Sequence, residues 1–369
     1  MVRSVFFQVL ILCLAPAIAR GQQDGAFSRR TANASVPKNI ILVLAEGLGL
    51  TQISAGIYDN GNSHNLERFP YTGLQKAKAS DALVADAGAA ATAISCGVAT
   101  SQNLIGLNQQ KKSVQNIFEI GKARGFSTGI ISTGLLSDPA PAAFVAHRAL
   151  KAGDEAIAEA YLQGHVDFFV GGGRQSFSIR TSDQRDLAEE LKARGFVTTQ
   201  YHPDSISVTT FDFKRNFAAF FDSVGPLDGG ATYILPAIRL GMVYLKNHSK
   251  KNGFVLVIHY HRILESSRLT QPENLLSDMK AFGQVIGAVL DFAAGDGETL
   301  VVATGTPENG GIAIQPGSQM GEMTFKYGST GPTGALVPVF AYGPGAPLFM
   351  GVYENTAVHK KVLQALGWR

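Results

Sequence analysis

Residues 83–107 read LVADAGAAATAISCGVATSQNLIGL, and this stretch sets the expectations for the rest of the chain. Asp86 precedes a run of small residues that ends at Cys96, and Gly97 follows the run. An acidic residue is a favoured helix N-cap, and glycine is common just past a helix end. We therefore predict a closely packed helix over 87–96 with free N–H groups at its start, an arrangement that suits a phosphate. The first helical residue is Ala87, which carries a methyl group and no hydroxyl.

The bulk composition limits the classes of protein to consider. The chain has 369 residues, of which 45% are hydrophobic, enough for one large α/β domain or two smaller ones. The formal charge of +3 is too small to indicate nucleic acid or a membrane surface as a partner. We predict no nucleic-acid partner and no transmembrane segment.

The first residues have the pattern of a signal peptide. Arg3 supplies a positive start, residues 5–14 are apolar apart from Gln8, and Ala17-Ile18-Ala19 fits the cleavage pattern. The apolar run is too short to span a membrane. We therefore predict a signal peptide at 1–19, a flexible lead-in at 20–37, and a single domain at 38–369. The expected location is periplasmic or extracellular, and Cys96 is then the only cysteine of the mature chain.

Apolar runs alternate with helical patterns along the rest of the chain, which is typical of a parallel sheet covered by helices on both faces. We predict an α/β protein, a three-layer α/β/α sandwich around a mainly parallel sheet. Buried strands are expected at 39–45, 127–133, 166–170, 254–258, 299–304 and 337–342. Helices are expected at 87–96, 113–124 with a Ser113 cap, 154–163, 184–194, 231–247 with Pro236 in its first turn or at a kink, 275–294, and 357–366 with a Thr356 cap. Residues 201–226 show no clear periodic pattern and are interpreted as a family-variable excursion.

The stretch at 83–107 resembles the nucleophile segment of the alkaline phosphatases, Asp-Ser-Ala/Gly-Ala-x-Ala-Thr-Ala. The residues that match are Asp86, Gly88, Ala89, Ala91, Thr92 and Ala93. Residues 39–49, 132–147, 167–174 and 337–368 resemble further segments of that family, in the same order. The resemblance implies the family fold, a homodimer, and hydrolysis of phosphate monoesters by a serine, two zinc ions and a magnesium-type site.

The same resemblance implies that several site positions are altered. The nucleophile falls on Ala87, and the arginine that holds the phosphate falls on Lys151, a point charge that lacks the guanidinium fork. The aspartate shared between metals becomes Glu46, and the magnesium-type position keeps a carboxylate at Asp138. The remaining metal-ligand positions fall on His259 and on Ala140, Leu264, Arg268, Gly305, Thr306 and Pro332.

These substitutions predict that no catalytic residue of the phosphatase reaction remains. Apolar residues, a glycine, a proline and a cation do not ligate zinc through their side chains. We expect no bound zinc or magnesium cofactor. Asp86 is then most simply a helix cap, and Lys151 with Arg148 are surface charges that can still attract an anion.

His259 and His261 form a His-x-His pair at the end of an expected strand. Because side chains alternate along a strand, both rings are predicted on the same side. Glu46, Asp138 or Glu265 could complete a new metal site with them. The alternative is a polar strand end without a metal, because the sequence spacing fixes no third ligand.

Three hypotheses about function follow. The first is an exported protein with the alkaline phosphatase fold that is not an enzyme and that binds an unidentified protein or a small anionic ligand. The second is a metal-dependent hydrolase with altered chemistry at His259 and His261. The third is residual phosphate-ester hydrolysis by a metal-bound hydroxide without a serine.

Overall fold

The apolar run that begins at Asn39 forms β1 (Asn39–Gly47), a central strand whose residues are all buried. It pairs in parallel with β9 (Phe254–Tyr260) on one side and with β10 (Thr299–Asn309) on the other. All residues of those two neighbours are buried as well. The expectation of a central parallel strand covered on both faces is confirmed.

In the computed structural model β1 belongs to an 11-stranded sheet within the described residues, 36–208, 211–222, 230–249 and 252–368. The order is β15 (Gly351–Glu354), β2 (Tyr71–Lys76), β14 (Val337–Tyr342), β10, β1, β9, β4 (Ser127–Leu135), β6 (Phe168–Gly172), β8 (Phe217–Phe221) and β7 (Val197–Gln200), with β13 (Pro332–Thr333) beside β10. From β10 to β7 all neighbours are parallel, whereas β14 is antiparallel to both β10 and β2. Two short ribbons join β3 (Leu104–Ile105) to β5 (Arg148–Ala149) and β11 (Ile312–Ile314) to β12 (Phe325–Tyr327).

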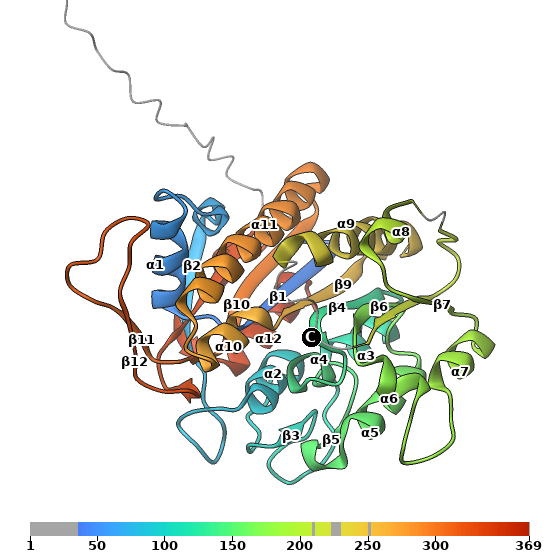
Figure 1. Ribbon diagram of the computed structural model, residues 1–369. Helices are drawn as coiled ribbons and strands as arrows, with labels where there is room; N and C mark the ends of the chain where they lie inside the picture. Colours follow the sequence, from blue (N-terminus) through green and yellow to red (C-terminus); the bar gives the residue numbers. More distant parts are fainter. Residues whose placement is uncertain (1–35, 209–210, 223–229, 250–251, 369) are drawn as a thin grey trace, which may run out of the picture. The chain divides into compact units, whose positions relative to one another are not determined.

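Helices cover both faces of this sheet, so the predicted α/β/α sandwich is confirmed (Figure 1). One face carries α2 (Ala87–Cys96), α3 (Ile117–Ala123), α4 (Pro139–Ala142), α5 (Asp154–Ala158), α6 (Arg174–Ser178), α7 (Leu187–Ala193) and α12 (Thr356–Ala365). The other carries α1 (Leu50–Asp59), α8 (Pro203–Val208), α9 (Gly230–His248), α10 (Arg262–Arg268) and α11 (Pro272–Asp296). Alternate residues of β1 enter the two cores, with Leu42 on the α2 side and Val43 on the α11 side.

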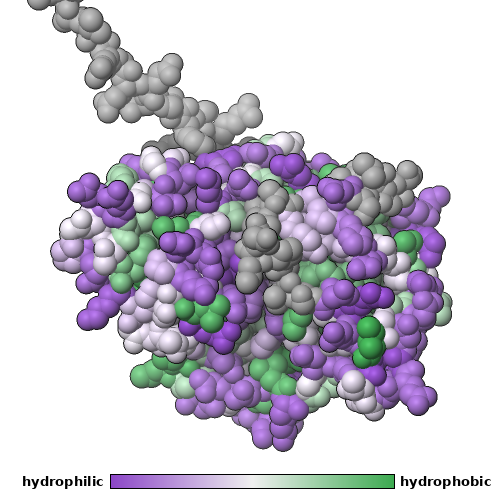
Figure 2. Space-filling model, in the orientation of Figure 1, coloured by the Kyte–Doolittle hydropathy of each residue, from purple (hydrophilic) through white to green (hydrophobic). Residues whose placement is uncertain are grey.

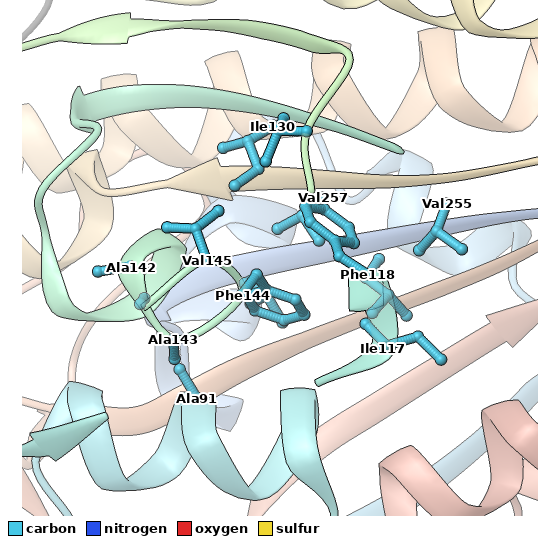
Figure 3. Close-up of a cluster of buried hydrophobic side chains, with 14 of the residues drawn as sticks. Ala91, Ile117, Phe118, Ile130, Ala142, Ala143, Phe144, Val145, Val255 and Val257 are labelled. Atoms are coloured by element: carbon cyan, nitrogen blue, oxygen red, sulfur yellow. The ribbon is translucent and has the colours of Figure 1, made fainter. Parts of the chain in front are cut away.

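The core on the α2 side packs tightly because its helices present small residues. Figure 3 shows Val257 of β9 above Phe118 of α3 and Phe144, with Ala91 of α2 below them. The rings of Phe118 and Phe144 lie 5.6 Å apart between their centroids. A methyl-sized side chain at Ala91 lets α2 approach this cluster closely.

Hydrophilic side chains cover most of the face shown in Figure 2, with hydrophobic side chains in small separate areas. Among the helices in the described ranges, none is long and apolar enough to cross a membrane. The expected signal peptide lies outside the described residues, as does all of the lead-in except residues 36 and 37.

Several predicted details are wrong. The helix expected from Ser113 begins at Ile117, because Asn116 forms a capping box with Glu119, while Ser113 forms a bridge with Leu107. The closing helix is capped by the side chain of Asn355, which accepts from the N–H of Thr356.

Two further predictions on the β9 side of the sheet need correction, the first of them in part. Pro236 lies inside α9, beyond its first turn, because the helix already begins at Gly230; the first-turn alternative is therefore wrong, and a kink at Pro236 stays a prediction. Residues 201–226 are not an excursion, since they include α8 and the buried strand β8, which pairs with both β6 and β7. Residues 209–210 and 223–226 of that stretch lie outside the described part of the chain.

Candidate functional site

Glu46 lies at the carboxyl end of β1, and only 4% of its side chain is exposed. Gly47 follows with φ of 84°, a left-handed conformation that favours glycine. A Cβ at Gly47 would lie 2.8 Å from the Cα of Leu264, so glycine also allows close approach to α10. The end of β1 is thereby held against the start of α10, which fixes where the Glu46 carboxylate lies.

The two histidines reach Glu46 from the neighbouring strand. His259 is near the end of β9, where it pairs in register with Leu44 of β1, and His261 is the N-cap residue of α10. The His259 Nε2 atom lies 2.9 Å from Glu46 Oε2, and the His261 Nδ1 atom lies 3.0 Å from the same oxygen. The prediction that both rings lie on one side is confirmed, and Glu46 is the partner that they share.

Three polar side chains surround this trio. Ser132 Oγ lies 2.9 Å from His259 Nδ1. Asp138 Oδ2 lies 3.8 Å from His261 Nδ1, and Glu265 Oε2 lies 3.8 Å from His261 Nε2. The His259 side chain is fully buried, whereas the side chains of His261 and Asp138 are 17% and 16% exposed. The cluster is therefore open to solvent on the His261 side.

The protonation of the cluster follows from its contacts. Burial raises the pKa of Glu46, but the hydrogen bonds with His259 and His261 outweigh it and bring the pKa to about 2. Burial lowers the pKa of His261, but Glu46 and the other nearby carboxylates outweigh it and bring the pKa to about 9. Burial raises the pKa of Asp138. At neutral pH, Glu46 and His261 form a carboxylate–imidazolium pair.

Glu46, His259 and His261 also have the spacing of metal ligands. Each offers one ligand atom, and these atoms all lie within 4.8 Å of one another. Within the described part of the chain, no other group of His, Cys, Asp or Glu meets that spacing.

The start of α2 agrees with the sequence prediction. Asp86 is the N-cap and Gly97 the C-cap, with φ of 71°. The two carboxylate oxygens of Asp86 accept hydrogen bonds from Ala89 N at 2.7 Å and from Asn103 N at 2.5 Å. Ala87, half-buried, is the first residue of the helix. Both carboxylate oxygens thus accept backbone hydrogen bonds around the position where the resemblance expects a nucleophile.

Three further positions that the sequence analysis singled out, Ala140, Arg148 and Lys151, also lie on the α2 side of the sheet. Ala140 is buried in α4. Lys151 is exposed, and Arg148 is half-buried in the short strand β5, which pairs with β3. The structure thus leaves the Lys151 side chain at the surface, as the sequence suggested.

Two of the positions where the resemblance expects a metal ligand, Leu264 and Arg268, lie on α10. The backbone of Leu264 lies against Gly47 at the end of β1. Arg268 is exposed and forms an ion pair with Glu265, with 3.0 Å between Nη2 and Oε1. Glu265 therefore lies between Arg268 and the His261 ring.

The remaining positions lie on β10 and β13. The Gly305 carbonyl accepts a hydrogen bond from Gln75, and a Cβ there would lie 2.5 Å from the Leu48 carbonyl oxygen. Thr306 is buried, and its hydroxyl has no hydrogen-bond partner among the described residues. Pro332 is exposed and pairs with Asn309. Among the described residues, no hydrogen bond or ion pair links these three residues to the Glu46 cluster.

Sequence reasoning missed Glu308 and Ser132. Glu308 is buried on β10 and accepts hydrogen bonds from Gln52, from Gly311 N and from Thr333. It was overlooked because the strand was expected to end at Thr304, and it continues to Asn309. Ser132 lies within a strand that was predicted, but only the neighbouring strand β9 reveals that its hydroxyl faces His259.

Comparisons with known proteins agree with this architecture. The family model described as alkaline phosphatase matches residues 37–202. Alkaline phosphatase 3 of Bacillus subtilis is 24% identical, and the alignment covers 93% of this chain and 92% of that protein. The alkaline phosphatase of Escherichia coli is 26% identical, with 96% of this chain and 91% of that protein covered.

Solved structures give the same result. The alkaline phosphatase of the Antarctic bacterium TAB5 has a TM-score of 0.83 and is 31% identical, with 90% of this chain and 99% of that chain covered. The alkaline phosphatase of Thermus thermophilus, 20% identical with a TM-score of 0.81, shows the same fold over 97% of this chain and 96% of its own. The sequence match to the TAB5 protein extends over nearly its whole length, and on these grounds the chain belongs to the alkaline phosphatase family.

Proposed function

We propose that this chain is a divergent member of the family that does not hydrolyse phosphate monoesters and that binds a protein or a small anionic ligand. The observation that carries the proposal is Ala87 at the first turn of α2. A serine there would attack phosphorus through its oxygen and form a phosphoseryl intermediate. A methyl group has no lone pair, so this step has no nucleophile.

The metal positions support the same proposal. The zinc pair would need side-chain donors at the positions that the resemblance assigns to it. Leu264, Gly305 and Pro332 carry none, and Arg268 is a cation paired with Glu265. The residues present therefore do not fit two zinc ions, and we derive no step through them.

A binding role is consistent with the fold that remains. The central strands are fully buried, and α2 keeps its cap and its close packing although its first turn has no nucleophile. Lys151 and Arg148 supply positive charge on the α2 side, where β5 pairs with β3. We propose that an anionic group is held there without being cleaved. The signal-peptide pattern of residues 1–19 supports a location in a periplasm or outside the cell as part of this proposal.

A second candidate function is a metal-dependent hydrolase that uses His259 and His261. The observation that favours it is the convergence of Glu46, His259 and His261, because a metal ion with one open coordination position can activate water. Residual phosphate-ester hydrolysis by a metal-bound hydroxide is a weaker candidate than this second function. The reason is that Lys151 replaces the arginine that the resemblance expects to bind the phosphate.

The test is an assay of the purified mature protein with a chromogenic phosphate monoester, with added zinc and magnesium, beside the TAB5 enzyme. We expect product formation at the rate of the protein-free buffer. A metal-dependent rate within a few orders of magnitude of the TAB5 enzyme would overturn the proposal. Turnover of carboxylic or sulfate esters alone, lost in a His261→Gln variant, would favour the second candidate.

A further inference from the structure

We propose that Glu46, His259 and His261 bind one transition-metal cation of the zinc type, with Asp138 or a solvent molecule as the fourth ligand. This inference goes beyond the proposed function, because a single ion can stabilise or organise the protein whether or not any ester is hydrolysed. Glu46, Asp138 and His259 stand at positions where the resemblance expects metal ligands, whereas His261 does not. The proposal is that the two imidazoles change the class of metal that this cluster suits from magnesium to zinc.

The donor atoms are already close to the required arrangement. Zinc bonds of about 2.0–2.1 Å in a tetrahedron place neighbouring donor atoms about 3.3 Å apart. Glu46 Oε2 lies 2.9 Å from His259 Nε2 and 3.0 Å from His261 Nδ1, and all three ligand atoms lie within 4.8 Å of one another. Movements of side chains by an ångström or less are enough to seat an ion, since the donors lie on the neighbouring strands β1 and β9 and just beyond β9.

The environment of His259 can hold the ring in the form that a metal requires. A metal at Nε2 leaves the proton on Nδ1, which must donate it to an acceptor. Ser132 Oγ lies 2.9 Å from Nδ1. The serine oxygen can accept a hydrogen bond from this N–H, because the serine hydroxyl can itself donate to the Leu135 carbonyl, 3.4 Å away. Its other contact, Gly134 N at 3.0 Å, is also a donor to the oxygen.

His261 has a matching partner on its far side. When Nδ1 binds the metal, Nε2 carries a proton and faces the carboxylate of Glu265 at 3.8 Å. A carboxylate behind a ligating histidine orients the ring and strengthens its donor nitrogen. Asp138 Oδ2 lies 3.8 Å from Nδ1, near enough to become the fourth ligand. The exposed fractions of His261 and Asp138, 17% and 16%, give the ion a route from solvent.

The donor set selects the class of metal. Magnesium prefers oxygen ligands in an octahedron, whereas imidazole nitrogen favours zinc, cobalt, nickel or copper. Two of the three donors here are imidazoles, and His259 is fully buried, so it cannot be replaced by water ligands without opening the core. We therefore expect zinc to bind in the presence of a large excess of magnesium.

A rival arrangement is a metal-free ion pair between Glu46 and the two histidines. The test uses the full mature chain, stripped of metal with a chelator and then dialysed against zinc in magnesium-containing buffer. Elemental analysis should give one zinc per chain. Cobalt in place of zinc should give visible d–d absorption bands of a four-coordinate site with nitrogen ligands, and zinc should abolish these bands.

The variant that tests the assignment is His261→Gln, because this side chain is the most exposed of the three. Glutamine still donates a hydrogen bond to Glu46, so the fold is expected to persist, which circular dichroism checks. Zinc affinity should fall at least about tenfold. The matched control is His165→Gln, since His165 is also a half-buried histidine near a carboxylate, Glu119, at 3.7 Å. That control should bind zinc like the parent protein.

Either of two results would overturn the proposal: a parent protein that holds no zinc and shows no cobalt bands, or zinc binding that is equal in His261→Gln and the parent. The cobalt spectrum of the parent decides the question even if the variant does not fold. Loss of phosphatase or other ester hydrolysis has no bearing on it, so the outcome is separate from that of the proposed function.

Discussion

At Ala87 a single methyl group stands where the family resemblance expects a hydroxyl. We predict that Ala87→Ser does not create phosphatase activity. An unactivated hydroxyl is a weak nucleophile at neutral pH, and both oxygens of the neighbouring Asp86 carboxylate already accept backbone hydrogen bonds. The measurement is the rate of phosphate-monoester hydrolysis by Ala87→Ser with zinc and magnesium.

The matched control for this serine is Ala87→Gly, which changes the same position without adding a hydroxyl. Both variants are expected to stay at the rate of the parent protein. Robust zinc-dependent turnover by Ala87→Ser alone would show that the ligand positions read from the resemblance are wrong.

Residue-level prediction of the site succeeded where a short-range rule applies. The cap at Asp86 follows from local helix preferences. Both His259 and His261 face Glu46 as expected, but alternation along a strand does not explain it, because β9 ends at Tyr260 and His261 is the N-cap residue of α10. That Glu46, rather than Asp138 or Glu265, accepts from both rings depends on β1 and β9 being neighbours. Sequence spacing contains no information about that adjacency.

At the level of elements, α2 depends on Asp86 for its first turn. We predict that Asp86→Ala lowers the free energy of unfolding by about 1–2 kcal/mol, because it removes the cap on Ala89 N and the hydrogen bond from Asn103 N. Asp86→Ser keeps a cap but is too short to reach both groups. Its cost should lie between zero and that of alanine.

Chemical denaturation of the parent and the two variants measures these differences. If serine restored nothing, the cap would contribute little, and the Asn103 contact would account for the whole effect. Equal stability of all three proteins would contradict the assignment of Asp86 as a structural residue.

The packing of α12 against α2 gives the chain a pH-dependent element. His359 on α12 is 5% exposed, and its ring lies against Gly97, where a Cβ would come within 2.6 Å of Cδ2. Burial lowers its pKa from 6.5 to about 4, although backbone groups of Ile94 and Ser95 act in the opposite direction. The folded protein therefore keeps His359 neutral where the unfolded chain is already protonated.

It follows that stability is lost as the pH falls from 6.5 towards 4, because the unfolded state binds the proton more readily. At pH 4 this one group lowers the free energy of unfolding by about 3 kcal/mol relative to neutral pH. The measurement compares unfolding free energies of the parent and His359→Gln at a series of pH values. Glutamine does not titrate, so the difference between the two proteins should change over this interval, and parallel curves would contradict the prediction.

The elements themselves were predicted well where an apolar run is long and bounded. β1, β9 and α11 lie close to their expected positions, because burial on both faces or a long periodic pattern is visible locally. β8 was missed although Phe217–Phe221 is entirely apolar, since the stretch around it was interpreted as an excursion. The end of β10 was missed because polar residues such as Glu308 are buried there through partners far away in the sequence.

On the scale of the whole molecule, the order of the strands lay beyond sequence reasoning. β2 is placed beside β14 and β15, whose residues follow it by more than 250 positions, and β14 runs antiparallel to both β10 and β2. Such pairings are decided by which long-range contacts bury the most surface together. The family resemblance supplied what local patterns could not, and the solved relatives agree with it.

The proposed metal site joins two strands of the central sheet, and its effect should therefore appear in the unfolding of the whole molecule. Glu46 and His259 are separated by 213 positions in the sequence. An ion held between them binds the folded chain and not the unfolded one. At a free zinc concentration one hundred times the dissociation constant, such binding adds about 2.7 kcal/mol to the free energy of unfolding.

We therefore predict that zinc raises the melting temperature of the metal-stripped protein by several degrees, and that the rise grows with the logarithm of the zinc concentration. Magnesium at the same concentrations should leave the melting temperature unchanged, because the two imidazole donors do not suit it. His261→Gln should abolish most of the zinc effect, whereas His165→Gln should retain it. A rise of equal size in all three proteins would place the ion elsewhere, and a rise with magnesium alone would assign the cluster to oxygen donors around Asp138.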